Sequence, residues 1–146
     1  MKTFKKLLIE LRACSDAREW AGDMTIEEVV EKCHRGDWLL WLSKKVDIGL
    51  QPLTLAKGHC AATVLHLMKD ERSKRAVKVA ISFGEGNSTR DELDAAAASA
   101  AYAAAYAAAD DAYADARTKN QLETANICRK YIGELLINKV NNLLKI

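Results

Sequence analysis

Apolar side chains return every three or four residues along most of this chain, which is the spacing of amphipathic helices. In the first segment, Phe4, Leu7, Leu8 and Leu11 share one helical face. Val, Ile and Thr do not gather into the alternating runs that half-buried strands show, and the helix formers Ala, Leu, Lys and Glu dominate instead. The pattern therefore predicts an all-α fold.

Capping and breaker residues divide this pattern into seven or eight helices. Thr25 with Glu28, and Thr89 with Glu92, have the spacing of a capping box. Pro52 suits the first turn of a helix, because its missing N–H would have no helical partner there. The predicted helices span about residues 3–11, 14–21, 25–33, 38–46, 52–68, 70–83, 89–119 and 121–144.

Several of these boundaries depend on single residues. We expect Gly36 to close the turn after the third helix, and Asp37 to cap the fourth. Asp70 is expected to cap the sixth helix, which residues 84–86 end. Gly133 is a candidate break in the last helix.

The longest predicted helix, residues 89–119, contains a run of alanine between residues 95 and 109. Small side chains allow neighbouring backbones to approach closely, so we expect a single domain over residues 1–146 that is built as a compact helical bundle around this long Ala-rich helix. The bulky side chains expected to pack around it, as part of the core, are Trp38, Trp41 and Phe83.

The composition agrees with one domain and narrows the class of partner. A chain of 146 residues, 49% of them apolar, is long enough to bury one core. The net charge of +2 gives no reason to expect strong nonspecific binding to nucleic acid. No stretch is long and apolar enough for a membrane span, and no export signal is recognised. The four cysteines are widely spaced. Together with the lack of a recognised export signal, this spacing predicts a cytoplasmic protein whose cysteines are reduced.

The residues that often carry chemistry do not form a recognisable site. Cys33-His34 and His59-Cys60 are adjacent pairs, and neighbours on a helix point about 100° apart, so neither pair suits one metal ion. His59 and His66 have no sequence partners that would make a catalytic dyad or triad. We therefore predict a non-enzymatic protein with no catalytic residue, no cofactor and no metal.

Two charged segments are candidate interaction surfaces. Residues 89–117 carry two basic and six acidic side chains, a balance of −4. The first candidate surface for a protein partner lies in this segment and consists of Asp110, Asp111, Asp115 and Tyr113. The alternative is a basic patch on the helix at residues 70–84, consisting of Arg72, Lys74, Arg75 and Lys78, which would contact nucleic acid.

From about residue 53 to residue 131, the order of features resembles a family of small all-helical immunity proteins of bacteria and phages. The shared elements are a helix with Cys60-Ala61-Ala62, the segment at residues 70–77, a short Gly-Glu segment, and Glu92-Leu93 leading into an Ala-rich helix. Ser73 stands where the family commonly has proline. The resemblance implies an immunity or anti-defence factor that occludes a protein partner. It carries no catalytic residues over to this chain.

Overall fold

The computed structural model describes the backbone of residues 2–97 and 114–146, and the side chains of residues 2–97 and 118–146. Within these ranges the chain is helical and forms no strand, so the predicted all-α fold is confirmed. The helices are α1 (Phe4–Glu10), α2 (Ser15–Ala21), α3 (Ile26–Lys32), α4 (Gly36–Lys45), α5 (Leu50–Ala62), the 3-10 helix η1 (Leu65–Leu67), α6 (Glu71–Gly84) and α8 (Ala114–Leu144), with a further helical stretch at residues 90–97.

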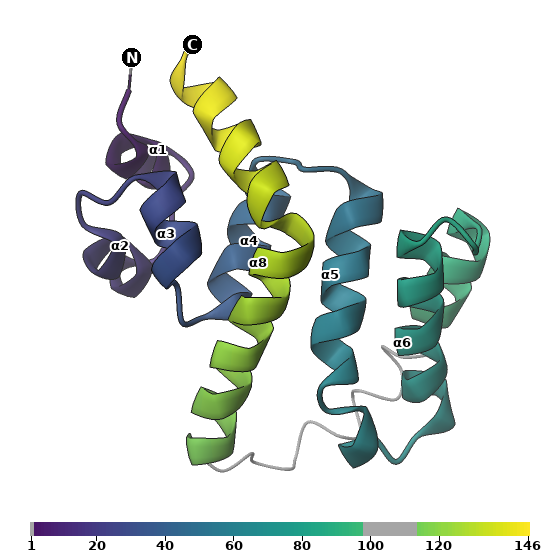
Figure 1. The fold of residues 1–146 in the computed structure, drawn as a ribbon. Coiled ribbons are helices and arrows are strands. Elements are labelled where there is room, and N and C mark those ends of the chain that lie inside the picture. The colour runs from purple at the N-terminus through teal and green to yellow at the C-terminus, as the bar shows by residue number, and fades with distance from the viewer. Residues whose placement is uncertain (1, 98–113) are drawn as a thin grey trace.

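The described helices are arranged around α8. This helix contacts α4, α5, α3 and α1, whereas α6 packs against α5. Figure 1 shows the resulting order, with α1, α2 and α3 on one side of α8, α5 on the other side, and α6 outside α5. The two chain ends lie at the same end of the bundle (Figure 1). No helix in the described ranges has the length and apolar character needed to cross a membrane.

One face of α8 supplies the centre of the core. Ala125, Cys128, Ile132, Leu136 and Val140 are all buried, and they recur every three or four residues along the helix. This spacing places them in one stripe that the surrounding helices cover. The buried side chains that complete this core from α3, α4 and α5 include Ile26, Val29, Val30, Leu39, Leu42, Ala56 and Cys60.

The helix starts predicted from capping residues are confirmed where they depend on local hydrogen bonds. The Thr25 hydroxyl accepts from the N–H of Glu28 at 3.3 Å, and the Glu28 carboxylate accepts from the N–H of Thr25 at 3.3 Å. Thr89 and Glu92 make the same reciprocal pair at 3.1 Å each. The Asp70 carboxylate caps α6 by accepting from the N–H two residues later, at 2.8 Å. These bonds satisfy N–H groups that have no partner inside the helix.

The prediction for Gly36 and Asp37 is wrong. Gly36 is the first residue of α4 rather than the end of a turn, and Arg35 occupies the capping position. A Cβ on Gly36 would lie 2.6 Å from the carbonyl carbon of Thr124 in α8, so the two helices can cross here only at a glycine. Asp37 falls in the first turn of α4 and pairs with Arg35.

The predicted end of the fifth helix, near residue 68, is also wrong. α5 ends at Ala62, and the chain continues into the short 3-10 helix η1. The Thr63 hydroxyl donates to the carbonyl of Cys60 at 2.7 Å, and the amide of Asn120 in α8 donates to that hydroxyl at 2.8 Å. A side chain that bonds to the backbone in this way competes with helix continuation, and the bond from α8 holds it in place.

The boundary predicted near residue 120 is absent, because α8 runs from Ala114–Leu144 without a break. Gly133 does not divide the helix either; it is buried, and a Cβ there would lie 3.2 Å from a methyl group of Val30. Residues 98–109, which make up most of the Ala-rich run, lie outside the described residues. The prediction of one helix over residues 89–119 depends on them and so also falls outside the described part of the chain.

Candidate functional site

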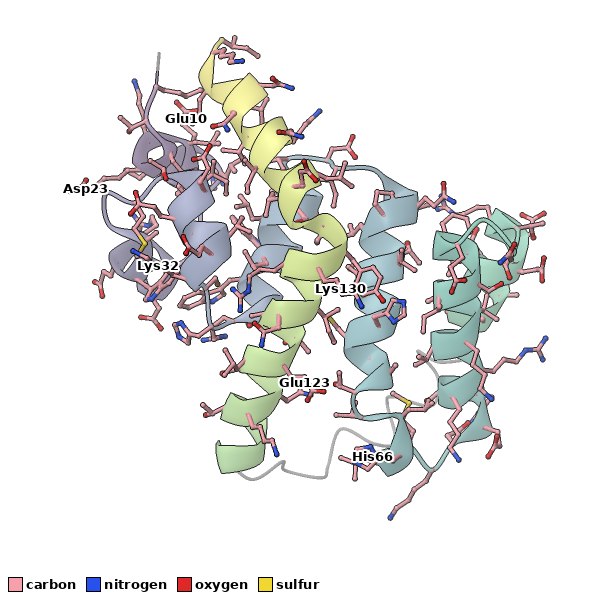
Figure 2. The ribbon with its side chains drawn as sticks, viewed as in Figure 1. Glu10, Asp23, Lys32, His66, Glu123 and Lys130 are labelled. Carbon is pink, nitrogen blue, oxygen red and sulfur yellow. The ribbon has the colours of Figure 1, made fainter. Side chains whose placement is uncertain are left out.

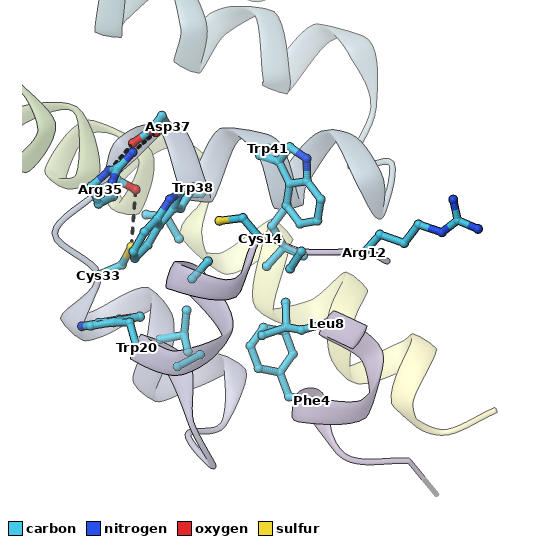
Figure 3. Close-up of a pocket in the computed structure, with 16 residues that line it drawn as sticks. Phe4, Leu8, Arg12, Cys14, Trp20, Cys33, Arg35, Asp37, Trp38 and Trp41 are labelled. Atoms are coloured by element: carbon cyan, nitrogen blue, oxygen red, sulfur yellow. Dashed lines mark hydrogen bonds and ion pairs between the residues drawn. The ribbon is translucent and has the colours of Figure 1, made fainter. Parts of the chain in front are cut away.

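A cavity of about 470 Å³ opens between α1, α2, α3 and α4. Its walls carry three tryptophans, Trp20 from α2 and Trp38 and Trp41 from α4, together with Phe4 and Leu8 from α1. We call this cavity the tryptophan pocket (Figure 3). Each of the three tryptophans is half-buried, because it packs against the core and also lines the pocket.

Trp38 and Trp41, which the sequence predicts to be part of the core, are partly buried and pack against the edge of the core. The stripe of α4 that packs inward consists of smaller residues, among them Leu39, Leu42 and Ser43, which are buried. Trp38 and Trp41 lie on the neighbouring face of the same helix, toward α1 and α2. Large aromatic rings that are neither buried nor isolated are the surfaces that partner molecules most often contact.

Aromatic and cationic groups hold the Trp38 ring in position. The rings of Trp20, His34 and Trp38 contact one another, with the centroid of the His34 ring 5.6 Å from that of each tryptophan in edge-on geometry and the two tryptophan centroids 6.0 Å apart. The guanidinium carbon of Arg35 lies 4.6 Å from the centre of the Trp38 ring, which is a cation–π contact. His34 and Arg35 belong to the short segment between α3 and α4, and Trp20 belongs to α2, so two separate parts of the chain position the Trp38 ring.

An ion pair lies at the edge of the pocket beside Trp38. The guanidinium of Arg35 donates to both carboxylate oxygens of Asp37, at 2.9 and 2.6 Å. This hydrogen-bonded cation lowers the pKa of Asp37 below its ordinary value, because it favours the charged carboxylate. The same pair raises the pKa of Arg35. The two charges cancel locally, so this side of the pocket carries no net charge.

Arg12 lines the pocket from the end of α1 and has an unusual backbone conformation. Its φ is +61°, in the left-handed region that favours glycine. The N–H of Ala13 donates to the carbonyl of Leu8 at 3.0 Å, and that of Arg12 to the carbonyl of Ile9 at 3.0 Å. This is the Schellman pattern that ends many helices, with arginine where glycine is usual. Arg12 is exposed and forms no ion pair within the described part of the chain.

The four cysteines divide into one exposed and three buried thiols. Cys14 is exposed and lines the tryptophan pocket next to Arg12. Cys33 is buried beside the pocket and donates to the carbonyl of Arg35 at 3.4 Å. Burial raises the pKa of Cys33, and a hydrogen bond with Cys60 together with burial raises the pKa of Cys128, so both stay protonated near neutral pH.

Neither histidine-cysteine pair forms part of a metal site in the described structure, where no group of three suitable ligands occurs. His34 is engaged with the tryptophans, and His59 stacks on Tyr131 with ring centroids 4.3 Å apart. His66 lies on η1 at the far end of the bundle from the chain termini (Figure 2). The structure therefore does not bring the three histidines together.

The acidic surface predicted from the sequence cannot be placed. Asp110, Asp111 and Tyr113 lie outside the described residues. Asp115 falls in the first turn of α8, but its side chain also lies outside the described residues.

The structure places the predicted basic patch on α6 and pairs part of it with acidic residues. Arg72 donates to Asp70 at 2.8 Å, and the ammonium group of Lys74 lies 3.2 Å from the carboxylate of Glu71. The pairing with Arg72 lowers the pKa of Asp70 to about 2. Arg75 and Lys78 are exposed, and neither forms an ion pair within the described ranges. The basic patch therefore has less uncompensated charge than the sequence suggests.

Comparison with protein-family models, with curated proteins and with solved structures finds no match for this chain. The tryptophan pocket is thus identified by its geometry alone. One signal in the sequence indicates it: all three tryptophans of the chain fall between residues 20 and 41. Helical periodicity by itself cannot separate a core tryptophan from one that lines an open pocket, because both occupy apolar positions.

Proposed function

We propose that this protein is a non-enzymatic binding protein of the immunity or anti-defence kind, which occludes a partner protein docked at the tryptophan pocket. The observation that carries the proposal is the presence of three half-buried tryptophans around one open cavity, beside an arginine, Arg12, that forms no ion pair with the described residues. Tryptophan and arginine are the residues most enriched among those that dominate binding energy at protein interfaces.

The rigidity of the pocket also supports a binding role. Trp38 is held by His34, by Arg35 and by its own helix, so little side-chain freedom is lost when a partner docks. The resemblance of residues 53–131 to immunity proteins supplies the biological setting, in which a small protein neutralises another by covering its working surface.

Affinity capture from the host organism tests the proposal with three baits. These are the native protein, the Trp38→Ala variant, and a variant in which Asp110, Asp111 and Asp115 are all replaced by lysine. We expect a partner that the native protein and the lysine variant retain equally, and that Trp38→Ala loses. Circular dichroism and thermal unfolding of each bait establish that the fold is kept.

Two outcomes would contradict this proposal. Equal capture by the native protein and Trp38→Ala would remove the pocket from the interface, and loss of the partner with the lysine variant alone would favour the acidic surface. Occlusion is tested separately, by adding the native protein to the purified partner. An immunity role requires the partner's activity to fall in proportion to the complex formed.

The basic patch on α6 supports a second candidate, nucleic-acid binding, through the exposed side chains of Arg75 and Lys78, which form no ion pair in the part of the chain that the structure describes. A salt titration of binding to generic double-stranded DNA separates the two candidates. Contacts with phosphates make affinity fall steeply as salt rises. A steep fall that Arg75→Glu abolishes would favour this candidate, and the absence of binding near physiological salt would remove it.

A further inference from the structure

We infer that the docked segment of the partner carries a large apolar side chain next to a carboxylate, the apolar group filling the tryptophan pocket and the carboxylate pairing with Arg12. This inference rests on the proposed function, and it adds the chemistry of the segment that the pocket recognises.

The apolar half of the inference follows from the lining of the pocket. Thirteen of its sixteen lining residues are apolar, among them Phe4, Leu8 and the three tryptophans, and the volume of about 470 Å³ is within the usual range for ligand cavities. Covering these rings with another apolar group removes apolar surface from water on both partners. A polar side chain would find few groups there with which to exchange its hydrogen bonds to water.

The acidic half follows from the charges at the pocket. Three charged residues line it within the described structure: Arg12, Arg35 and Asp37. Arg35 and Asp37 neutralise each other through two hydrogen bonds, which leaves Arg12 as the uncompensated cation among these lining residues. The Lys45 ammonium lies outside the lining, 5.8 Å from the centre of the Trp41 ring. Figure 3 shows the Arg12 side chain extending away from the tryptophan rings, where it can reach a group beside the apolar anchor. A carboxylate there gains an ion pair, whereas a cation is repelled.

The backbone at Arg12 gives a second, independent reason to assign this residue a binding role. Three helices end in the same Schellman pattern, with Arg12, Asp47 and Gly86 in the left-handed position. Gly86 is the residue expected there, and Asp47 is of a type that tolerates it. Arg12 is the exception, since a long side chain gains nothing locally from this strained conformation. Such strain is found preferentially at functional sites.

Selection from a phage-displayed library of random peptides tests the inference. Four baits are compared: the native protein, Arg12→Glu, Trp38→Ala, and Lys57→Glu. Lys57 is exposed on α5, which does not line the pocket, so Lys57→Glu makes the same change of net charge elsewhere. We expect the native protein and Lys57→Glu to enrich peptides with an aromatic or large aliphatic residue beside Asp or Glu.

Arg12→Glu is expected to keep the apolar preference and lose the acidic one. For a peptide selected on the native protein, this variant should bind about tenfold more weakly at low salt, and the difference should shrink as salt is added. Trp38→Ala should lose the apolar preference. Thermal unfolding of every bait shows that these changes arise in the folded protein.

The outcomes separate this inference from the proposed function. Peptides that depend on Trp38 but show no acidic preference, or an acidic preference that Arg12→Glu leaves unchanged, would overturn the inference and leave docking at the pocket intact. If the native protein enriches no peptides, or if the enriched peptides bind Trp38→Ala equally well, both the inference and the docking role of the pocket are wrong.

Discussion

Arg12, Asp47 and Gly86 occupy the same backbone position at the ends of α1, α4 and α6, with φ values of +61°, +58° and +83°. For a residue with a side chain, the left-handed conformation costs about 1–2 kcal/mol relative to the right-handed one. Glycine adopts either conformation with equal ease. The three helix ends therefore allow a direct comparison of arginine, aspartate and glycine in the same backbone conformation.

Replacing Arg12 by glycine should stabilise the protein while weakening binding. We expect Arg12→Gly to raise the free energy of unfolding by about 0.5–1 kcal/mol, because it relieves the strained conformation. Urea denaturation measures this change. Asp47→Gly is the matched control, since it relieves the same conformation at a site that does not line the tryptophan pocket. A loss of stability in Arg12→Gly would show that the arginine side chain supports the fold.

The pair of Arg35 and Asp37 makes a contribution to stability that depends on pH. Because Arg35 lowers the pKa of Asp37 in the folded state, the pair stabilises the protein above the ordinary carboxyl pKa of 3.8. That contribution is lost as the pH falls through the lowered pKa. We expect Asp37→Asn to be less stable than the native protein at pH 7, and this difference to shrink as the pH falls below 3.8. Thermal unfolding across this range checks the sign, and a difference that grows on acidification contradicts it.

At the scale of elements, glycines set how closely the helices approach. A Cβ on Gly84 of α6 would lie 2.6 Å from the Cα of Leu55 in α5, and one on Gly58 of α5 would lie 2.8 Å from Ile81 in α6. Gly36 likewise allows α4 and α8 to approach closely. Helix propensity alone favours alanine over glycine, so these positions are explained by packing between elements.

Substitution of Gly36 decides between propensity and packing. Propensity predicts that Gly36→Ala stabilises the protein, whereas the contact with Thr124 predicts a loss of about 2–3 kcal/mol from overpacking. We expect the loss. Gly22→Ala is the comparison, because its nearest neighbouring atom would be 3.9 Å away and only its φ of +50° opposes a side chain. Denaturant unfolding should show the smaller loss in Gly22→Ala, and a stabilised Gly36→Ala would refute the close approach of α4 and α8.

At the scale of the whole molecule, stability is distributed unevenly between α8 and α6. α8 contributes five buried side chains to the core and contacts four other helices. In α6, Val77 is the one side chain that the described structure buries fully, and the helix packs mainly against α5. A helix held through one neighbour can separate from it without exposing the rest of the core.

Native-state hydrogen exchange should therefore divide the protein into two parts. We expect the amides of α6 to exchange through a local opening, well before those of α8 between Ala125 and Val140, which exchange on global unfolding. Because global unfolding includes the opening of α6, Val77→Ala should speed exchange in both α6 and α8. Leu136→Ala should speed exchange in α8 and leave the local opening of α6 unchanged. Equal protection in α6 and α8 would show that the bundle opens as one unit.

Features that depend on neighbours along the chain can be predicted from the amino-acid sequence alone. The all-α class, the capping boxes at Thr25 and Thr89, and the start of α6 at Asp70 all arise from hydrogen bonds that span a few residues. Tertiary structure decided the rest. α5 ends where Asn120 of α8 donates a hydrogen bond to Thr63. Gly36 is part of α4 because α8 packs closely against the helix at this position. Trp38 lines a pocket because α1 and α2 leave its ring partly uncovered. In each case the deciding atoms belong to a helix distant in sequence, and periodicity carries no information about them.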